Sequence, residues 1–144
     1  MANSDNPFAP PETIEPALGR VRSYWEGLKR GEAPMPFWDD VTLSSLPDLV
    51  DDLMLIDVFN QPERFRFNTV GASIAKRHGD PVVGKFAADI PLQRPFRFLR
   101  AQCSATVEAR APTYYRDADS SARLLLPMWG EGRVGMLLGA FDWR

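Results

Sequence analysis

The stretch RFRFNTVGASIAKRHGDPVVGK, Arg64 to Lys85, contains the change of periodicity that decides the fold. Its first seven residues alternate phenylalanine with polar side chains, which predicts a β-strand over Arg64 to Val70 with one buried face. After Gly71 the pattern becomes helical, and it predicts a short helix over Ala72 to His78 that ends at a glycine. A strand that leads through a glycine directly into a helix indicates a mixed α+β domain.

The residues before this stretch add a second strand and a helix. Met54 to Phe59 forms an apolar run that a four-residue loop joins to the strand at Arg64, so the two runs predict a hairpin. Further upstream, Pro16 to Arg30 predicts an amphipathic helix, since its apolar residues fall on one arc: Ala17, Leu18, Val21, Tyr24, Trp25 and Leu28. Residues 1–13 are rich in Pro, Asn and Asp, and we expect them to be disordered.

The residues after Lys85 predict one longer helix and three strands. Pro95 suits a first helical turn, and apolar side chains recur at helical spacing from Phe96 to about Arg110. The strand candidates are Thr113 to Arg116, Arg123 to Trp129 and Arg133 to Phe141, and a Gly-Glu-Gly turn joins the last two. The whole order predicts an α+β fold with a five-stranded antiparallel sheet, helices on one face and an N-terminal amphipathic helix, in a single domain over residues 14–144.

Composition narrows the classes of function. The chain has 144 residues, with 17 basic and 19 acidic side chains that nearly cancel, so we expect neither a nucleic acid nor a membrane as a partner. The first fifteen residues hold no apolar run, and we expect no secretory signal. Cys103 is the single cysteine, which excludes an internal disulfide and fits a cytoplasmic protein.

Three segments together resemble the PAS domain family, in particular a stand-alone subgroup of it. They are Arg64 to Lys85, the closing run LLLPMWGEGRVGMLLGAF at Leu124 to Phe141, and the opening run YWEGLKRGEAP at Tyr24 to Pro34. The resemblance implies a sheet with a helical wall around a small cavity, used in signalling to sense a ligand or to bind partner proteins. It does not identify the ligand or a cofactor.

If the PAS resemblance holds, a small and largely apolar cavity lies between the sheet and the helix after Pro95. We expect apolar residues of that helix, of the short helix and of the strands to form its wall, with His78 and Tyr115 as its polar members. No inward-facing Arg or Lys is evident, so the expected ligand is neutral or apolar. The predicted wall consists of Phe67, Ile74, His78, Phe96, Leu99, Cys103, Tyr115, Leu125 and Met136.

No catalytic motif is present: the sequence has no Gly-x-Ser-x-Gly turn, no phosphate-binding glycine loop and no His-Glu-x-x-His helix. One His and one Cys are too few for a zinc site, and we expect no metal. Two alternatives to the regulatory module stay open. One is a small cone-shaped isomerase or dehydratase in which Asp57, His78 and Tyr115 converge, and the other is an interaction domain without a ligand.

The N-terminal helix also predicts self-association. Its apolar arc precedes the core of the domain, and in PAS-like proteins such a helix packs on the sheet or on a second copy. We therefore expect a homodimer through this helix and a signalling protein as partner.

Overall fold

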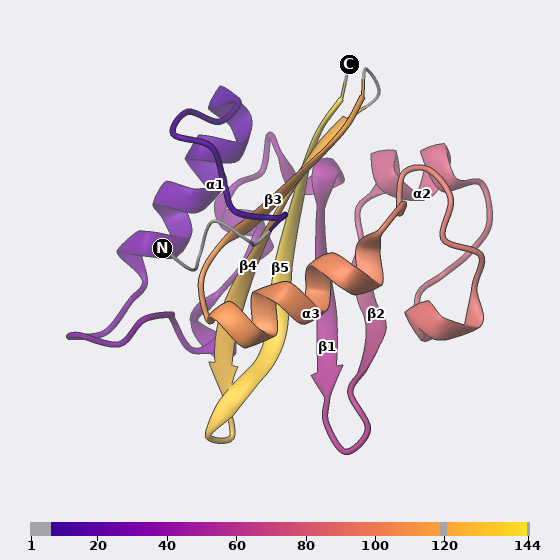
Figure 1. Cartoon of the computed structure of the whole chain (residues 1–144). Helices are drawn as coiled ribbons and strands as arrows, with labels where there is room; N and C mark the ends of the chain where they lie inside the picture. The colour runs from indigo at the N-terminus through magenta and orange to yellow at the C-terminus, as the bar shows by residue number, and fades with distance from the viewer. Residues whose placement is uncertain (1–6, 119–120, 144) are drawn as a thin grey trace.

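The computed structural model describes residues 7–118 and 121–143. Within these residues the chain is an α+β fold with a five-stranded antiparallel sheet in the order β2-β1-β5-β4-β3 (Figure 1). The elements are α1 (Pro16–Gly27), β1 (Leu53–Phe59), β2 (Arg64–Val70), α2 (Ala72–His78), α3 (Leu99–Ala109), β3 (Thr113–Asp117), β4 (Ser121–Gly130) and β5 (Arg133–Trp143). Four short 3-10 turns lie between them, at Trp38–Asp40, Leu43–Ser45, Val50–Asp52 and Ala87–Asp89.

Helices cover both faces of the sheet. Gln102 of α3 donates a hydrogen bond to Thr113 Oγ1, whereas Glu15, the residue before α1, accepts one from Tyr114. Thr113 and Tyr114 are neighbours in β3 and therefore point to opposite faces. We call the face under α3 the inner face and the face under α1 the outer face; in Figure 1, α3 crosses in front of the strands.

α1 is fixed to the outer face by its apolar side. Leu18, Val21 and Trp25 are buried, and the Trp25 indole N–H donates to the Pro127 carbonyl at 2.8 Å. The helix ends at Gly27, one turn before the predicted Arg30. The side that we expected to mediate self-association is thus occupied by the chain's own sheet.

α3 also differs from its predicted bounds, because it begins at Leu99 and not near Pro95. Phe98 has a φ of 58°, in the left-handed region, so residues 95–98 form a turn before the helix. The helix then packs Leu99, Cys103 and Thr106 against the sheet.

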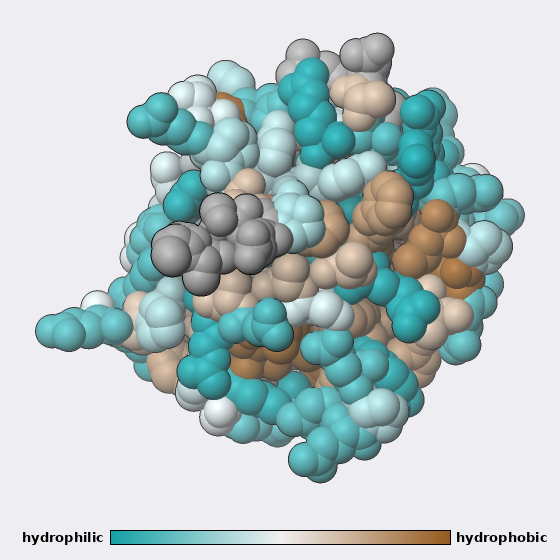
Figure 2. All heavy atoms as spheres, viewed as in Figure 1, coloured by the Kyte–Doolittle hydropathy of each residue, from teal (hydrophilic) through white to brown (hydrophobic). Residues whose placement is uncertain are grey.

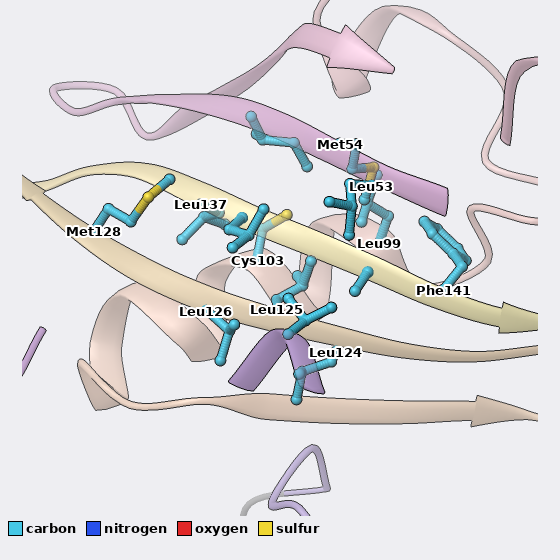
Figure 3. Close-up of a cluster of buried hydrophobic side chains, with 14 of the residues drawn as sticks. Leu53, Met54, Leu99, Cys103, Leu124, Leu125, Leu126, Met128, Leu137 and Phe141 are labelled. Carbon is cyan, nitrogen blue, oxygen red and sulfur yellow. The ribbon is translucent and has the colours of Figure 1, made fainter. Parts of the chain in front are cut away.

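The core lies on both sides of β4 and β5, which are buried along most of their length (Figure 3). Met54 and Leu125 meet across Gly139, where an added Cβ would lie 2.8 Å from Met54 and 3.1 Å from Leu125. Strands this apolar on both faces are typical of a sheet that is covered on both sides.

The N-terminal segment contributes one residue to this packing. Phe8 lies within residues 1–13, its side chain is buried, and its carbonyl accepts a hydrogen bond from the Tyr114 N–H at 2.8 Å. The segment around Phe8 therefore runs beside β3. No helix among the described residues has the length and apolar character needed to cross a membrane.

Candidate functional site

Most of the predicted wall residues do gather on the inner face, around the ring of Phe96. The ring centroids of Phe67 and His78 each lie 5.0 Å from that of Phe96. Six apolar residues of the predicted wall are at most 1% exposed: Phe67, Ile74, Phe96, Leu99, Cys103 and Leu125. These residues belong to one buried cluster on the inner face, which we call the inner layer.

The expectation that no Arg or Lys faces inward was wrong. Arg123 of β4 is 1% exposed on the inner face, with its guanidinium 5.2 Å from the ring centroid of Tyr115. It donates hydrogen bonds to Gln102 Oε1 at 2.7 Å, to the Pro95 carbonyl at 3.0 Å and to the Arg97 carbonyl at 2.9 Å. Burial lowers the pKa of Arg123 to about 10, so the side chain stays protonated at neutral pH.

Arg123 belongs to a buried polar cluster, which also contains Gln102, Thr106 and Thr113. Gln102 Nε2 donates to Thr113 Oγ1 at 3.1 Å, and the hydroxyls of Thr106 and Thr113 lie 2.6 Å apart. The arginine thus binds the turn before α3 and the helix itself to the sheet. The inward direction of Arg123 could have been predicted from strand alternation, because residues two apart in a strand point to the same face and Leu125 is buried.

Cys103 has no reactive character in this setting. It is completely buried, and burial raises the pKa of its thiol to about 12. The thiolate is the nucleophilic form, so this cysteine packs as a small apolar side chain.

His78 lies at the end of α2 beside the inner layer. Its Nδ1 is 3.1 Å from the Asp80 carbonyl, so Nδ1 carries the proton that is donated there. Among the described residues Nε2 is buried and has no hydrogen-bond partner. The imidazole packs against the ring of Phe96, with 5.0 Å between the ring centroids.

Asp57, His78 and Tyr115 do not converge. Asp57 pairs with Arg66 in the sheet register, one residue from Ile56, which pairs with Phe67. Since neighbouring residues of a strand point to opposite faces, Asp57 lies on the outer face while His78 and Phe67 lie on the inner one. The geometry that the isomerase hypothesis requires is absent from these three residues.

Met136 was also assigned to the wrong face. It pairs with Asp57 across β1 and β5, and both line a hollow of about 290 Å³ on the outer face. We call this the Trp38 hollow, and its walls are Trp38, Asp57, Asn68, Gly130, Glu131, Arg133, Gly135 and Met136.

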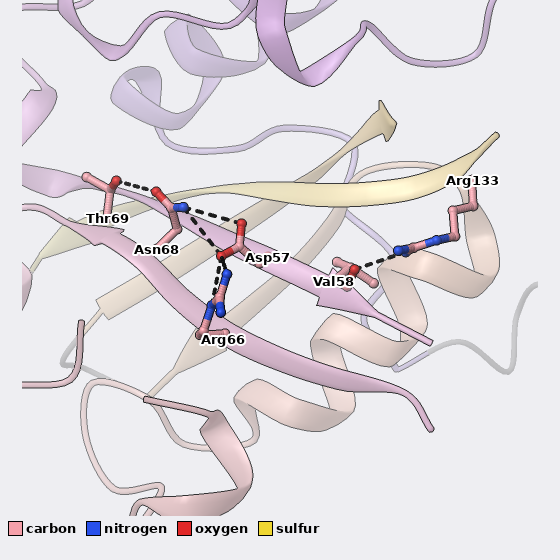
Figure 4. Close-up of polar contacts among 6 residues, drawn as sticks. All are labelled: Asp57, Val58, Arg66, Asn68, Thr69 and Arg133. Atoms are coloured by element: carbon pink, nitrogen blue, oxygen red, sulfur yellow. Dashed lines mark hydrogen bonds and ion pairs between the residues drawn. The ribbon is translucent and has the colours of Figure 1, made fainter. Parts of the chain in front are cut away.

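Asp57 is the most constrained polar group of the Trp38 hollow (Figure 4). Its side chain is 15% exposed, and Arg66 donates to its Oδ2 from Nε at 3.1 Å and from Nη2 at 3.0 Å. Asn68 Nδ2 lies 3.3 Å from Oδ1. The carboxylate is held from the β2 side, and its orientation is fixed without closing the hollow.

Trp38 forms the apolar wall, and two glycines make room for it. It is 49% exposed, and a Cβ at Gly130 would lie 2.9 Å from its Cδ1. A Cβ at Gly135 would lie 3.2 Å from the Gly130 Cα, so the two strands present bare backbone to the indole. Sequence reasoning did not find this site, although a glycine within a strand marks a close approach of this kind.

Apolar atoms gather at the right of Figure 2, over the segment between α2 and α3, where a second hollow includes Val70, Val82 and Val83. Among the described residues, no group of three or more His, Cys, Asp or Glu could hold a metal ion. Comparison of the chain with protein-family models, with curated proteins and with solved structures finds no match.

Proposed function

We propose that the chain is a PAS-like regulatory module that acts in signalling by binding a small ligand, a partner protein or both, and that it catalyses no reaction. The order of elements supports this proposal, since a helix, a hairpin, short helices, a longer helix and three strands follow one another as the PAS resemblance implies. The single cysteine supports a cytoplasmic location within the same proposal.

The observation that carries the proposal is the Trp38 hollow. Small-molecule sites are hollows that combine apolar wall residues with a few fixed polar groups. Trp38 and Asp57 meet this description, because one is half exposed and the other is held by Arg66. Phe98, which is 54% exposed beside the inner face, already contacts Arg97 and Tyr115 of the chain itself, whereas the rings of Phe67 and Phe96 are buried.

The inner layer remains the proposed place for a neutral or apolar ligand, but entry there has a cost. Phe96, Leu99 and Cys103 belong to one cluster and are fully buried, and Arg123 binds the turn before α3. A ligand would have to separate α3 from the sheet and break these hydrogen bonds. Binding at the outer face requires no such opening.

The isomerase hypothesis has no comparable support, because Asp57 and His78 lie on opposite faces of the sheet. We therefore propose one function only.

Native mass spectrometry of the chain, purified without denaturation, tests the proposal. We expect a retained small-molecule mass or a bound second polypeptide, together with a higher unfolding temperature than that of the stripped chain. A chain that carries no additional mass and is stabilised by no compound of a broad metabolite panel would contradict it. Trp38→Leu serves to assign any bound mass to the outer face.

A further inference from the structure

Tryptophan rings of this protein are regularly paired with cations from the same chain. Lys29 Nζ lies 4.5 Å from the ring centroid of Trp25, and Arg77 Cζ lies 4.2 Å from that of Trp143. Arg110 Cζ lies 5.8 Å from the Trp129 centroid. Distances of this size are those of cation–π contacts.

Trp38 departs from this pattern. It is the most exposed of the four tryptophans, and within residues 7–118 and 121–143 no Lys or Arg lies over its ring. Its indole N–H, too, makes no hydrogen bond to any described residue. The ring is therefore open to a group from another molecule.

Carboxylates lie beside this ring. Asp57 and Glu131 both line the Trp38 hollow, and Oδ1 of Asp57 has only a long contact, of 3.3 Å, to Asn68. A carboxylate oxygen has two lone pairs, so Oδ1 can accept a further hydrogen bond from the side of the hollow. The exposed Glu131 adds a second negative charge at the hairpin turn.

The two arginines near the hollow do not occupy this position. Arg66 is bound to Asp57 Oδ2 from the β2 side, and Arg133 donates from Nη1 to the Val58 and Val134 carbonyls. Figure 4 shows the Arg133 guanidinium at Val58, apart from the Asp57–Arg66 pair. Their charges weaken the attraction for a cation but leave the ring of Trp38 open.

We propose that the Trp38 hollow binds an organic cation, a guanidinium or alkylammonium group, with the charge between Trp38 and Asp57. This inference rests on the proposed function as a binding module. The methylene stem of the ligand lies along Met136 and the glycine backbone, which present apolar surface without projecting side chains. The cation belongs either to a small molecule or to an Arg or Lys side chain of a partner.

Nitrogen-15 NMR of the indole N–H groups tests the proposal with two probes of equal shape. Butylguanidinium carries the charge, and butylurea is its neutral isostere. We expect a saturable shift of the Trp38 signal with butylguanidinium, with Kd on the order of a millimolar, and no saturable shift with butylurea. Trp25 and Trp143 serve as internal references, because their indole N–H groups are bonded to Pro127 and Asp52.

Variants separate the contributions of the ring and the charge, with the amide signal of Gly135 as readout. Trp38→Leu should abolish saturable binding, and Asp57→Asn should weaken it at least about threefold. Gly130→Ala should weaken it without changing any charge, because its methyl group displaces the indole. Asp39→Asn is the matched control: Asp39 follows Trp38 in sequence but does not line the hollow, so binding should be unchanged.

Further measurements distinguish a cation on a partner protein from one on a small molecule. Tighter binding of a capped Gly-Arg-Gly peptide than of butylguanidinium assigns the site to a partner's side chain, and equal binding assigns it to a small molecule. Equal shifts with both isosteres, no saturable shift, or preference for acetate would overturn the proposal. No saturable butylguanidinium binding, together with a ligand retained in native mass spectra of both wild type and Trp38→Leu, would overturn the cation site while leaving the regulatory function standing.

Discussion

Replacing Gly71 should destabilise the fold, because a side chain at this position would lie too close to the backbone of a neighbouring turn. Gly71 joins β2 to α2 and has an ordinary φ of −63°. A Cβ on it would lie 2.3 Å from the Asp51 carbonyl oxygen and 2.7 Å from that of Val50, below the 3.0 Å that Cβ atoms keep from other heavy atoms. Both oxygens are backbone atoms of the turn before β1, and the Gly71 N–H donates to Leu53 in that strand at 2.8 Å. Neither partner can move alone.

We therefore expect Gly71→Ala to cost about 3 kcal/mol, the upper part of the range for overpacked sites, and Gly71→Val to cost more. In urea, with an m-value of about 2 kcal/mol/M, the midpoint should fall by about 1.5 M. Gly19→Ala is the matched control: nothing lies within 4 Å of its added Cβ at the end of the first turn of α1, so this change should stabilise by about 0.5 kcal/mol. An unchanged or higher midpoint for Gly71→Ala would refute the steric argument.

Four other predictions follow from the same structure. Arg123→Leu removes the donor from two buried acceptors and one part-buried acceptor and should cost about 3 kcal/mol or more in urea denaturation; a loss under about 1 kcal/mol would show that the buried polar cluster is dispensable. The unfolded Cys103 thiol ionises near pH 8.5 and the folded one only at about 12, so the free energy of unfolding should fall as pH rises through this window, by about 2 kcal/mol at pH 10. Cys103→Ala should lack that component of the fall, and parallel pH profiles for the two proteins would contradict the assignment. Phe8→Ala should cost about 1 kcal/mol or more if the segment around Phe8 is ordered beside β3, and a wild-type midpoint would instead favour the disorder that we expected for residues 1–13. A homodimer through α1 would have to use the exposed residues of the helix, so Glu26→Arg should dissociate it in sedimentation velocity. A wild-type chain that sediments as a monomer at tens of micromolar, on the order of weak-interface affinities, would contradict the dimer.

Local patterns predicted the parts of the fold that depend on neighbouring residues. The bounds of β2 and α2, Arg64–Val70 and Ala72–His78, were predicted correctly because alternation ends at Gly71 and helical spacing ends at Gly79. The start of α3 was wrong because Pro95 and Phe96 fit a helical pattern, whereas the left-handed Phe98 delays the helix. Nothing in the composition of residues 95–98 distinguishes the two.

The face assignment of β5 could not be predicted in the same way. The strand is apolar on both faces, so Met136, Leu137 and Leu138 give no alternation from which to choose a side. Met136 was consequently placed in the inner layer, although its register with Asp57 puts it on the outer face. The Trp38 hollow was missed for a related reason: its wall combines an irregular segment with two glycines that become neighbours only when the β4–β5 hairpin closes.

The two faces of the sheet are linked through β1. Asp57 points into the Trp38 hollow, while the preceding Ile56 is buried in the inner layer opposite Phe67. A cation bound at Oδ1 of Asp57 would share the carboxylate with Arg66, which donates to Oδ2, and would weaken this contact between β1 and β2 at the residue beside Ile56. Close-packed side chains respond to small displacements of the strand that carries them. We therefore expect binding at Asp57 to change the packing of the inner layer beside β1. Chemical shifts of the Ile56 and Leu137 methyl groups should therefore change during the butylguanidinium titration. Methyl signals that stay fixed while the Trp38 signal saturates would show that binding at the outer face leaves the packing of the inner layer unchanged.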